Sequence, residues 1–130
     1  PPELYANAQD LMDNYLEPLR AELNRRYGHL GEVKLVVRSW YRPEPYNTKV
    51  GGAKGSLHTQ GKAADVYATI NGKRIPNCYQ IARAREDMKL PGGRGCGANI
   101  NYHIDSGNTR IWWYTYTSWN QWEKNQGAKA

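Results

Sequence analysis

The 130-residue chain contains no phenylalanine, and leucine, isoleucine and valine are sparse. Five tryptophans and ten tyrosines must therefore supply much of the large apolar surface. Each of these side chains carries a polar group that needs a hydrogen-bond partner when it is buried. At this length we expect a single domain over residues 1–130, with a polar tail from about residue 125.

Long apolar runs are also missing. No stretch approaches the roughly 18 consecutive apolar residues that a membrane-spanning helix requires. The mean hydropathy of the chain is −0.87. The sequence therefore predicts no membrane insertion.

Acidic residues are outnumbered, since 18 lysines and arginines face 12 aspartates and glutamates and give a net charge of +6. This excess fits three kinds of partner: nucleic acid, an anionic membrane surface, or an anionic polymer such as a bacterial cell wall. The basic residues are dispersed, and no recognition-helix, zinc-finger or RNA-binding-sheet signature accompanies them. Nucleic acid is therefore not an expected partner.

Cysteine is nearly absent, with only Cys78 and Cys96. A disulfide between them would indicate an oxidising compartment. Two buried free thiols are the alternative. Neither cysteine has a second cysteine or a histidine at zinc-finger spacing, which makes a zinc finger a poor interpretation.

The first half of the chain predicts a helix, a strand and a long loop. Apolar residues spaced three and four apart predict an amphipathic helix over residues 2–27, with a kink or short break at Pro18 and an end at Gly28. Residues 33–40, VKLVVRSW, contain three β-branched valines and alternate loosely, which suits a strand. Residues 41–55 predict a loop with room for one helical turn. Long loops in compact domains are often functional.

The second half predicts more strands. Residues 63–70 read as a strand, and Asn71-Gly72 after them is a strong hairpin signal. Residues 99–105 and 109–117 look like two antiparallel strands joined by a short turn. These assignments favour a mostly antiparallel sheet.

A second helix and a glycine-rich segment lie between these strands. Asn77 can cap a helix, with Gln80 as its capping-box partner, and the helix should end near residue 91. The segment 91-PGGRGCG-97 reads as a loop. The expected fold class is therefore α+β, with a small mostly antiparallel sheet flanked by helices.

Histidine is also scarce, with only three residues in the chain. His29 follows a helix end and reads as a solvated side chain. His58 precedes Asp65 by seven residues, and His103 begins the short sequence 103-HID-105 on a predicted strand. A catalytic zinc takes about three protein ligands and keeps one position open for water. The spacing alone makes His58, Asp65 and His103 a modest metal-site hypothesis.

The wider sequence around these residues resembles a known family. The segment 56-SLHTQGKAAD-65 matches the S-x-H-x-x-G-x-A-x-D signature of the M15 zinc peptidases, the D-Ala-D-Ala carboxypeptidase and peptidoglycan endopeptidase group that includes phage endolysins. The segment 39-SWYRPEPYNTKVGGAKGS-56 resembles the family's upstream segment, with Trp40 in place of its usual glycine. The segments 16-LEPLR-20, 103-HID-105 and 110-RIWW-113 resemble its first helix and its ending.

The resemblance implies a hedgehog/DD-peptidase-like zinc peptidase fold and assigns roles by position. His58, Asp65 and His103 match the three ligands of Zn²⁺. Arg42 matches an arginine that binds or polarises the substrate carbonyl, which a fixed guanidinium can do. Ser56 matches the motif serine, which supports the ligands.

The implied activity is hydrolysis of peptide bonds in peptidoglycan stem or cross-link peptides, by a carboxypeptidase or an endopeptidase. The protein is expected to be a monomer that acts outside the cytoplasm (in the periplasm, in the cell wall or as a secreted protein) or is carried by a phage.

One departure from the family concerns the general base. Many members carry a glutamate three residues before the last histidine, where this chain has Ile100, and related enzymes carry a histidine at the position of Asn101. Neither residue is a base. Asp105 is on the same face of a strand as His103 and could orient it or accept a proton from water; orientation is favoured. The missing glutamate also motivates an alternative, a catalytically weak or inactive peptidoglycan-binding or structural module of a phage particle or secreted assembly.

Overall fold

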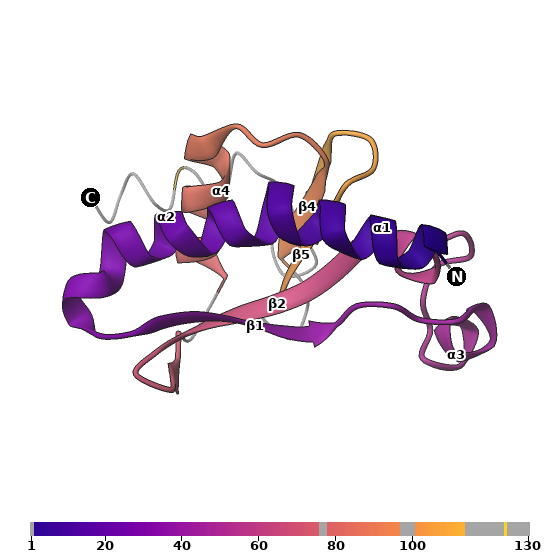
Figure 1. Ribbon diagram of the computed structural model, residues 1–130, viewed down its shortest axis with the longest axis horizontal. Helices are drawn as coiled ribbons and strands as arrows, with labels where there is room; N and C mark the ends of the chain where they lie inside the picture. The colour runs from indigo at the N-terminus through magenta and orange to yellow at the C-terminus, as the bar shows by residue number, and fades with distance from the viewer. Residues whose placement is uncertain (1, 76–77, 97–100, 114–123, 125–130) are drawn as a thin grey trace.

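A computed structural model describes residues 2–75, 78–96, 101–113 and 124. They form an α+β fold with one mixed sheet and helices, and the strand order is β1-β2-β5-β4-β6, with β3 paired to β2 (Figure 1). This confirms the predicted fold class. The helical segments are α1 (Pro2–Leu11), a π-helical turn (Met12–Leu16), α2 (Glu17–Tyr27), α3 (Glu44–Lys49), α4 (Tyr79–Met88) and 3₁₀ turns at Gly28–Leu30 and Leu57–Gln60. The strands are β1 (Val33–Ser39), β2 (Ala63–Ile70), β3 (Lys73–Arg74), β4 (Gly93–Cys96), β5 (Tyr102–Asp105) and β6 (Arg110–Trp113).

The N-terminal helix runs nearly the length of the molecule (Figure 1). Pro18 has no N–H to donate to the preceding turn. The structure accommodates it with the π-helical turn just before it, in which the Glu17 amide donates to the Met12 carbonyl. The expected break is therefore a change of helical pitch, after which α2 continues to its cap at Gly28.

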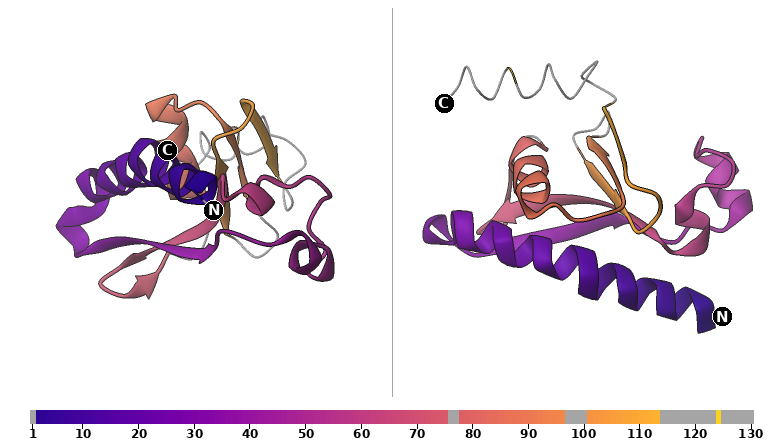
Figure 2. Two further views of the ribbon diagram at one scale, coloured as in Figure 1. Left: turned by 45° about the vertical axis from the view of Figure 1, so that its right-hand side comes forward. Right: turned by 90° about the horizontal axis from the view of Figure 1, so that it is seen from above.

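The helices α2 and α4 lie on the same side of the β1–β2 pair (Figures 1 and 2). Their buried side chains meet those of the sheet in one hydrophobic core, with Leu19, Leu23, Ile81 and Ala84 among its members. Strand β2 contributes alternate residues to this core, so the residues between them face the other way.

Two sequence predictions are confirmed at β2. The strand covers residues 63–70, as expected. Asn71 and Gly72 both have positive φ, +50° and +78°, as the primed hairpin turn requires, and β3 pairs back onto β2. The loop after β1 contains the expected helical turn, which is α3.

The prediction for the glycine-rich segment was wrong. Part of 91–97 is strand β4, which pairs antiparallel with β5 and parallel with β6. The strands β5 and β6 therefore do not form the expected hairpin, because β4 lies between them. A Cβ at Gly93 would overlap the side chains of Arg110 and Asp105, so close packing explains a glycine that sequence propensity assigns to a loop.

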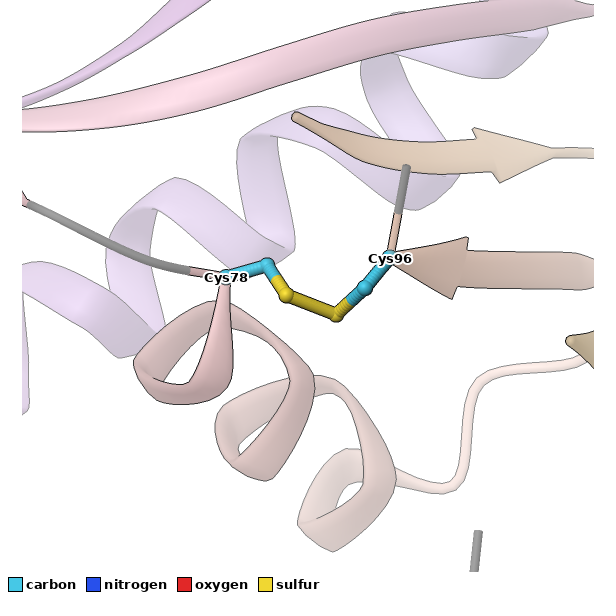
Figure 3. The surroundings of a disulfide bond; sticks show 2 residues. All are labelled: Cys78 and Cys96. Atoms are coloured by element: carbon cyan, nitrogen blue, oxygen red, sulfur yellow. A yellow bond between two sulfur atoms is a disulfide. The ribbon is translucent and has the colours of Figure 1, made fainter. Parts of the chain in front are cut away.

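Cys78 and Cys96 form a disulfide that joins the start of α4 to the end of β4 (Figure 3). Both are buried beside the core. Cys78 occupies the N-cap position of α4. Asn77, which the sequence predicts as the helix cap, lies outside the described residues. The predicted polar tail from about residue 125 lies outside them as well.

We predict that removing this disulfide destabilises the fold. The bond joins residues 18 apart in the sequence, and constraining a loop of that size contributes about 3 kcal/mol in the chain-entropy description. The double variant Cys78→Ala/Cys96→Ala should therefore unfold at a lower urea concentration than the wild type. Wild-type protein in excess dithiothreitol is the matched control and should unfold like the variant; an unchanged midpoint in both would contradict the prediction.

Candidate metal centre

His58 is held rigidly by the short 3₁₀ turn that carries it. The Ser56 hydroxyl caps this turn by accepting a hydrogen bond from the His58 amide at 3.2 Å. Gly61 ends the turn with a left-handed φ of +70°. The imidazole is buried, with 2% of the residue exposed. Its orientation is therefore set by the turn and by the groups around it.

The protonation of the His58 ring follows from one contact. Nδ1 lies 2.6 Å from the Trp40 carbonyl oxygen, and since a carbonyl only accepts, Nδ1 must carry the proton. Nε2 is then the nitrogen with the lone pair. It is buried without a hydrogen-bond partner and lies 3.3 Å from Oδ2 of Asp65. A buried nitrogen lone pair aimed at a carboxylate fits a metal ligand.

The pairing of β2 with β5 brings the other two candidate ligands together. Asp65 and His103 are directly opposite each other in the register of these strands. Nδ1 of His103 lies 3.0 Å from Oδ1 of Asp65. One donor atom from each of His58, Asp65 and His103 lies within 4.8 Å of the others. The three residues identified from the sequence thus converge on one point.

Asp105 is fully buried and is held by donors on every side. Its Oδ2 accepts from Nε2 of His103 at 2.7 Å and from Arg110 at 2.7 Å. Its Oδ1 accepts from the amides of Gly93 and Gly107, each at 2.9 Å, and from Arg110 at 3.1 Å. Burial alone would raise the pKa of this carboxyl, but these hydrogen bonds outweigh it and lower the pKa, so Asp105 stays ionised.

The contact with Asp105 also bears on His103. Because Nε2 faces the Asp105 carboxylate, it is the donor, and Nδ1 is the nitrogen that faces Asp65. In the metal-free protein burial disfavours the charged ring, but Asp105 and Asp65 outweigh it and raise the pKa of His103. Burial alone would raise the pKa of Asp65, but the imidazoles of His103 and His58 outweigh this effect and lower it.

Arg42 lies at the edge of this cluster. Its Nη2 is 3.7 Å from Oδ2 of Asp65, and its side chain is 17% exposed. The Arg42 amide donates to the His58 carbonyl at 2.9 Å, which ties the loop after β1 to the 3₁₀ turn. Nε of Arg42 is buried without a hydrogen-bond partner. The guanidinium is thus near the ligand donors and still has hydrogen-bonding capacity.

The donor set fits zinc. Two imidazole nitrogens and one carboxylate oxygen are ligands that catalytic zinc sites use, with a fourth position for water. The unpartnered, buried Nε2 of His58 is the clearest sign, because leaving such an atom without a partner is costly. Residues that supply hydrogen bonds to the ligands, such as Asp105, are a regular part of these sites.

Sequence reasoning missed two parts of the site. Arg110 was seen only as part of a resembling segment, yet it forms a two-pronged pair with Asp105. The Trp40 carbonyl fixes His58, and the Trp40 indole also donates to the Gly61 carbonyl at 2.8 Å. The resemblance of 110-RIWW-113 to the family's ending was a signal for Arg110, whereas a backbone carbonyl leaves no trace in a sequence.

Ile100 and Asn101 occupy the two positions at which relatives carry a general base. Ile100 lies outside the described residues. Asn101 is described, and its side-chain oxygen accepts a hydrogen bond from Arg74 at 2.8 Å. Its amide is thus used in a polar contact with a guanidinium.

Two comparisons with known proteins bear on this site. A family model described as Peptidase M15 matches residues 6–105. The zinc D-Ala-D-Ala carboxypeptidase of Streptomyces albus G is 31% identical over 83 residues, which is 64% of this chain and 32% of that protein. The chain therefore aligns with about a third of the length of the curated relative it matches.

We predict that Arg110→Gln destabilises the metal-free protein in a pH-dependent way. Asp105 has a folded-state pKa below the ordinary value of 3.8, so its ionised form stabilises the fold above that pH, and the contribution is lost as the pH falls through and below it. Losing the hydrogen bonds from Arg110 should cost about 2 kcal/mol at neutral pH and less in acid. Urea unfolding at pH 7 and pH 3 measures this difference. Arg20→Gln, on an exposed helix face, is the control, and an equal loss at both pH values for Arg110→Gln would contradict the argument.

Proposed function

This chain belongs to the M15 family of peptidases, and from that premise we propose that it is a zinc-dependent hydrolase of peptide bonds in peptidoglycan stem or cross-link peptides. The observation that carries the proposal is the convergence of His58, Asp65 and His103, in which the buried Nε2 of His58 has no hydrogen-bond partner. The matched relative is a zinc D-Ala-D-Ala carboxypeptidase, which supports the choice of both metal and substrate class.

In this proposal His58, Asp65 and His103 hold the zinc ion. A bound zinc ion acidifies its water and polarises the scissile carbonyl. His58 offers Nε2 because its Nδ1–H is committed to the Trp40 carbonyl. His103 offers Nδ1 because its Nε2 faces Asp105. Ser56 has a supporting role, since its hydroxyl caps the turn that carries His58.

Arg42 is proposed to bind the substrate at the reacting carbonyl. Its guanidinium is close to Asp65, at 3.7 Å, and its backbone is tied to His58. A fixed cation beside the site can stabilise the negative charge that develops on the carbonyl oxygen.

Asp105 is proposed to orient His103. Its two oxygens already accept five hydrogen bonds, from His103, Gly93, Gly107 and twice from Arg110. A carboxylate offers about four lone-pair positions, so removing a proton from water would require Asp105 to give up an existing partner. Its contacts therefore support positioning over a role as general base.

Two features are consistent with action outside the cytoplasm. The Cys78–Cys96 disulfide is typical of oxidising compartments. The net charge of +6 favours contact with an anionic polymer such as a cell wall. No helix among the described residues has the length and apolar character to cross a membrane. We propose an extracytoplasmic or phage-borne monomer that acts on peptidoglycan.

A second candidate is a module of the same fold that binds peptidoglycan with little or no turnover. The observation that favours it is Asn101, which is held by Arg74 where related enzymes have a base.

We predict that the purified protein binds about one zinc ion per chain, in line with a single site. Each of His58→Ala, Asp65→Ala and His103→Ala should abolish stoichiometric binding, because each removes one of three donors. His29→Ala is the matched control, since His29 is exposed and outside the cluster. Metal analysis after dialysis measures the effect; equal zinc content in the wild type and all three site variants would contradict the assignment.

We predict that the zinc-loaded protein releases peptide fragments from purified peptidoglycan. Mass analysis of the fragments would identify the bond that is cleaved. Arg42→Gln should retain zinc and lose about 10²-fold or more in kcat/KM, since it removes a cation at the developing charge. A zinc-loaded wild type that binds peptidoglycan in a pull-down but releases no fragment would select the binding module.

We predict that Asp105→Asn weakens zinc binding by about 10-fold to 100-fold, as expected when a hydrogen-bond partner of a ligand is changed. If Asp105 only positions His103, the activity that the variant retains at saturating zinc should depend on pH as in the wild type. In particular, kcat/KM should still fall toward low pH over the same range. Loss of that fall with unchanged zinc affinity would instead identify Asp105 as the base.

A further inference from the structure

A second polar row lies beside the metal ligands on the same face of the sheet. Tyr67 follows Asp65 by two residues on β2, so both side chains leave the face opposite to the buried Ala64, Val66 and Ala68. Two residues of β-strand correspond to about 6.6 Å. On the adjacent segment, Asn101 comes just before β5 and precedes His103 by two residues.

Arg74 comes to this row from the hairpin. It is opposite Thr69 in the pairing of β2 with β3, on the edge of β2 that also pairs with β5. From there its side chain leans over Tyr67, with the guanidinium carbon 4.3 Å from the ring centroid. Its Nη2 donates to Oδ1 of Asn101 at 2.8 Å. The guanidinium is thus directed along β2 toward the Asp65–His103 pair.

From this arrangement we propose that Arg74, on its Tyr67 platform, forms an anion subsite that binds a carboxylate of the peptide substrate. The proposal rests on the proposed function, and it adds a specificity residue to it.

The chemistry of the contacts favours this role. A guanidinium is planar, and its N–H groups form hydrogen bonds at the edge of that plane. This plane suits the two oxygens of a carboxylate, whose charge a guanidinium can meet with paired hydrogen bonds. The contact with the Tyr67 ring and the hydrogen bond to Asn101 reduce the side-chain entropy that binding would otherwise cost.

The position predicts where the carboxylate lies in the substrate. An extended peptide advances about 3.3 Å per residue. A separation of about two such steps between the metal ligands and Tyr67 therefore corresponds to a carboxylate about two residues from the scissile bond. The carboxylate read by Arg74 is thus distinct from the group at the reacting carbonyl, which is assigned to Arg42.

The test compares two synthetic peptides that end in D-Ala-D-Ala. They differ only in a glutamate or a glutamine placed two residues before the scissile bond found by peptidoglycan digestion, or before the D-Ala-D-Ala bond if digestion finds none. For zinc-loaded wild type we expect kcat/KM to be about 10-fold higher for the glutamate peptide, as one charge-assisted contact would give. In Arg74→Gln this ratio should fall to about one, with activity toward the glutamine peptide nearly unchanged.

Three further variants sharpen the test. Lys73→Gln removes the same charge from the adjacent, exposed position of β3 and should keep the wild-type ratio. Arg74→Lys should give an intermediate ratio, because lysine keeps the charge without the planar pair of donors. Tyr67→Leu should lower the ratio by removing the platform. Zinc content and thermal unfolding of every variant show that the site and the fold persist.

The outcomes separate the subsite from the proposed function. An unchanged ratio in Arg74→Gln, or an equal loss in Lys73→Gln, would overturn the subsite. If zinc-loaded wild type hydrolyses neither peptide, the proposed hydrolysis of these peptides fails, and binding calorimetry with the same pair decides the subsite: tighter binding of the glutamate peptide that disappears in Arg74→Gln supports it, and equal binding overturns it.

Discussion

The antiparallel pairing of β2 with β5 is the constraint on which the site depends. It sets Asp65 opposite His103 and leaves Ala64 and Ile104 paired on the other face, where both are fully buried. A slip of one residue would turn Asp65 into the core and expose its apolar neighbours. The hydrophobic core therefore holds the register, and the register brings the candidate metal ligands Asp65 and His103 together. Packing and chemistry are two consequences of the same strand alternation.

The parts of the fold that the sequence predicted are those with a local signal. The long helix, β2 and the Asn71-Gly72 turn each follow from spacing or turn chemistry within a few residues. Strand β4 has no such signal, because its glycines lower strand propensity, and the close approach of Arg110 and Asp105 to Gly93 appears only in the folded chain. The order of β5, β4 and β6 is likewise set by long-range pairing. Local propensity cannot identify a strand that is stabilised mainly by pairing with strands elsewhere in the sequence.

The candidate metal site likewise has parts that the sequence predicts and parts that it does not. The three candidate ligands were identified because a motif places them, and the structure brings them within 4.8 Å. Most of the groups that position these residues cannot be seen in the sequence. The Trp40 carbonyl accepts a hydrogen bond from His58, and the amides of Gly93 and Gly107 donate to Asp105, which in turn contacts His103. These are backbone groups, so side-chain identity carries no record of them. The candidate ligands could thus be read from residue types, whereas the groups that support them are visible only in the fold.

The polar contacts around the metal centre also bear on how catalysis can proceed without the family's glutamate. Asp105 is surrounded by donors, and Asn101 accepts a hydrogen bond from Arg74. To accept a proton from water, Asp105 would have to give up one of its hydrogen-bond donors, and the Asn101 amide is not a base. Two guanidiniums lie near the candidate ligands: Arg42 is 3.7 Å from Asp65, and Arg74 lies over Tyr67, two residues along β2 from Asp65. In the proposed function, Arg42 stabilises charge at the reacting carbonyl and Arg74 binds a carboxylate of the substrate. The departure at Asn101 has a structural counterpart, because Asn101 accepts a hydrogen bond from Arg74, which lies over Tyr67, two residues along β2 from the candidate ligand Asp65.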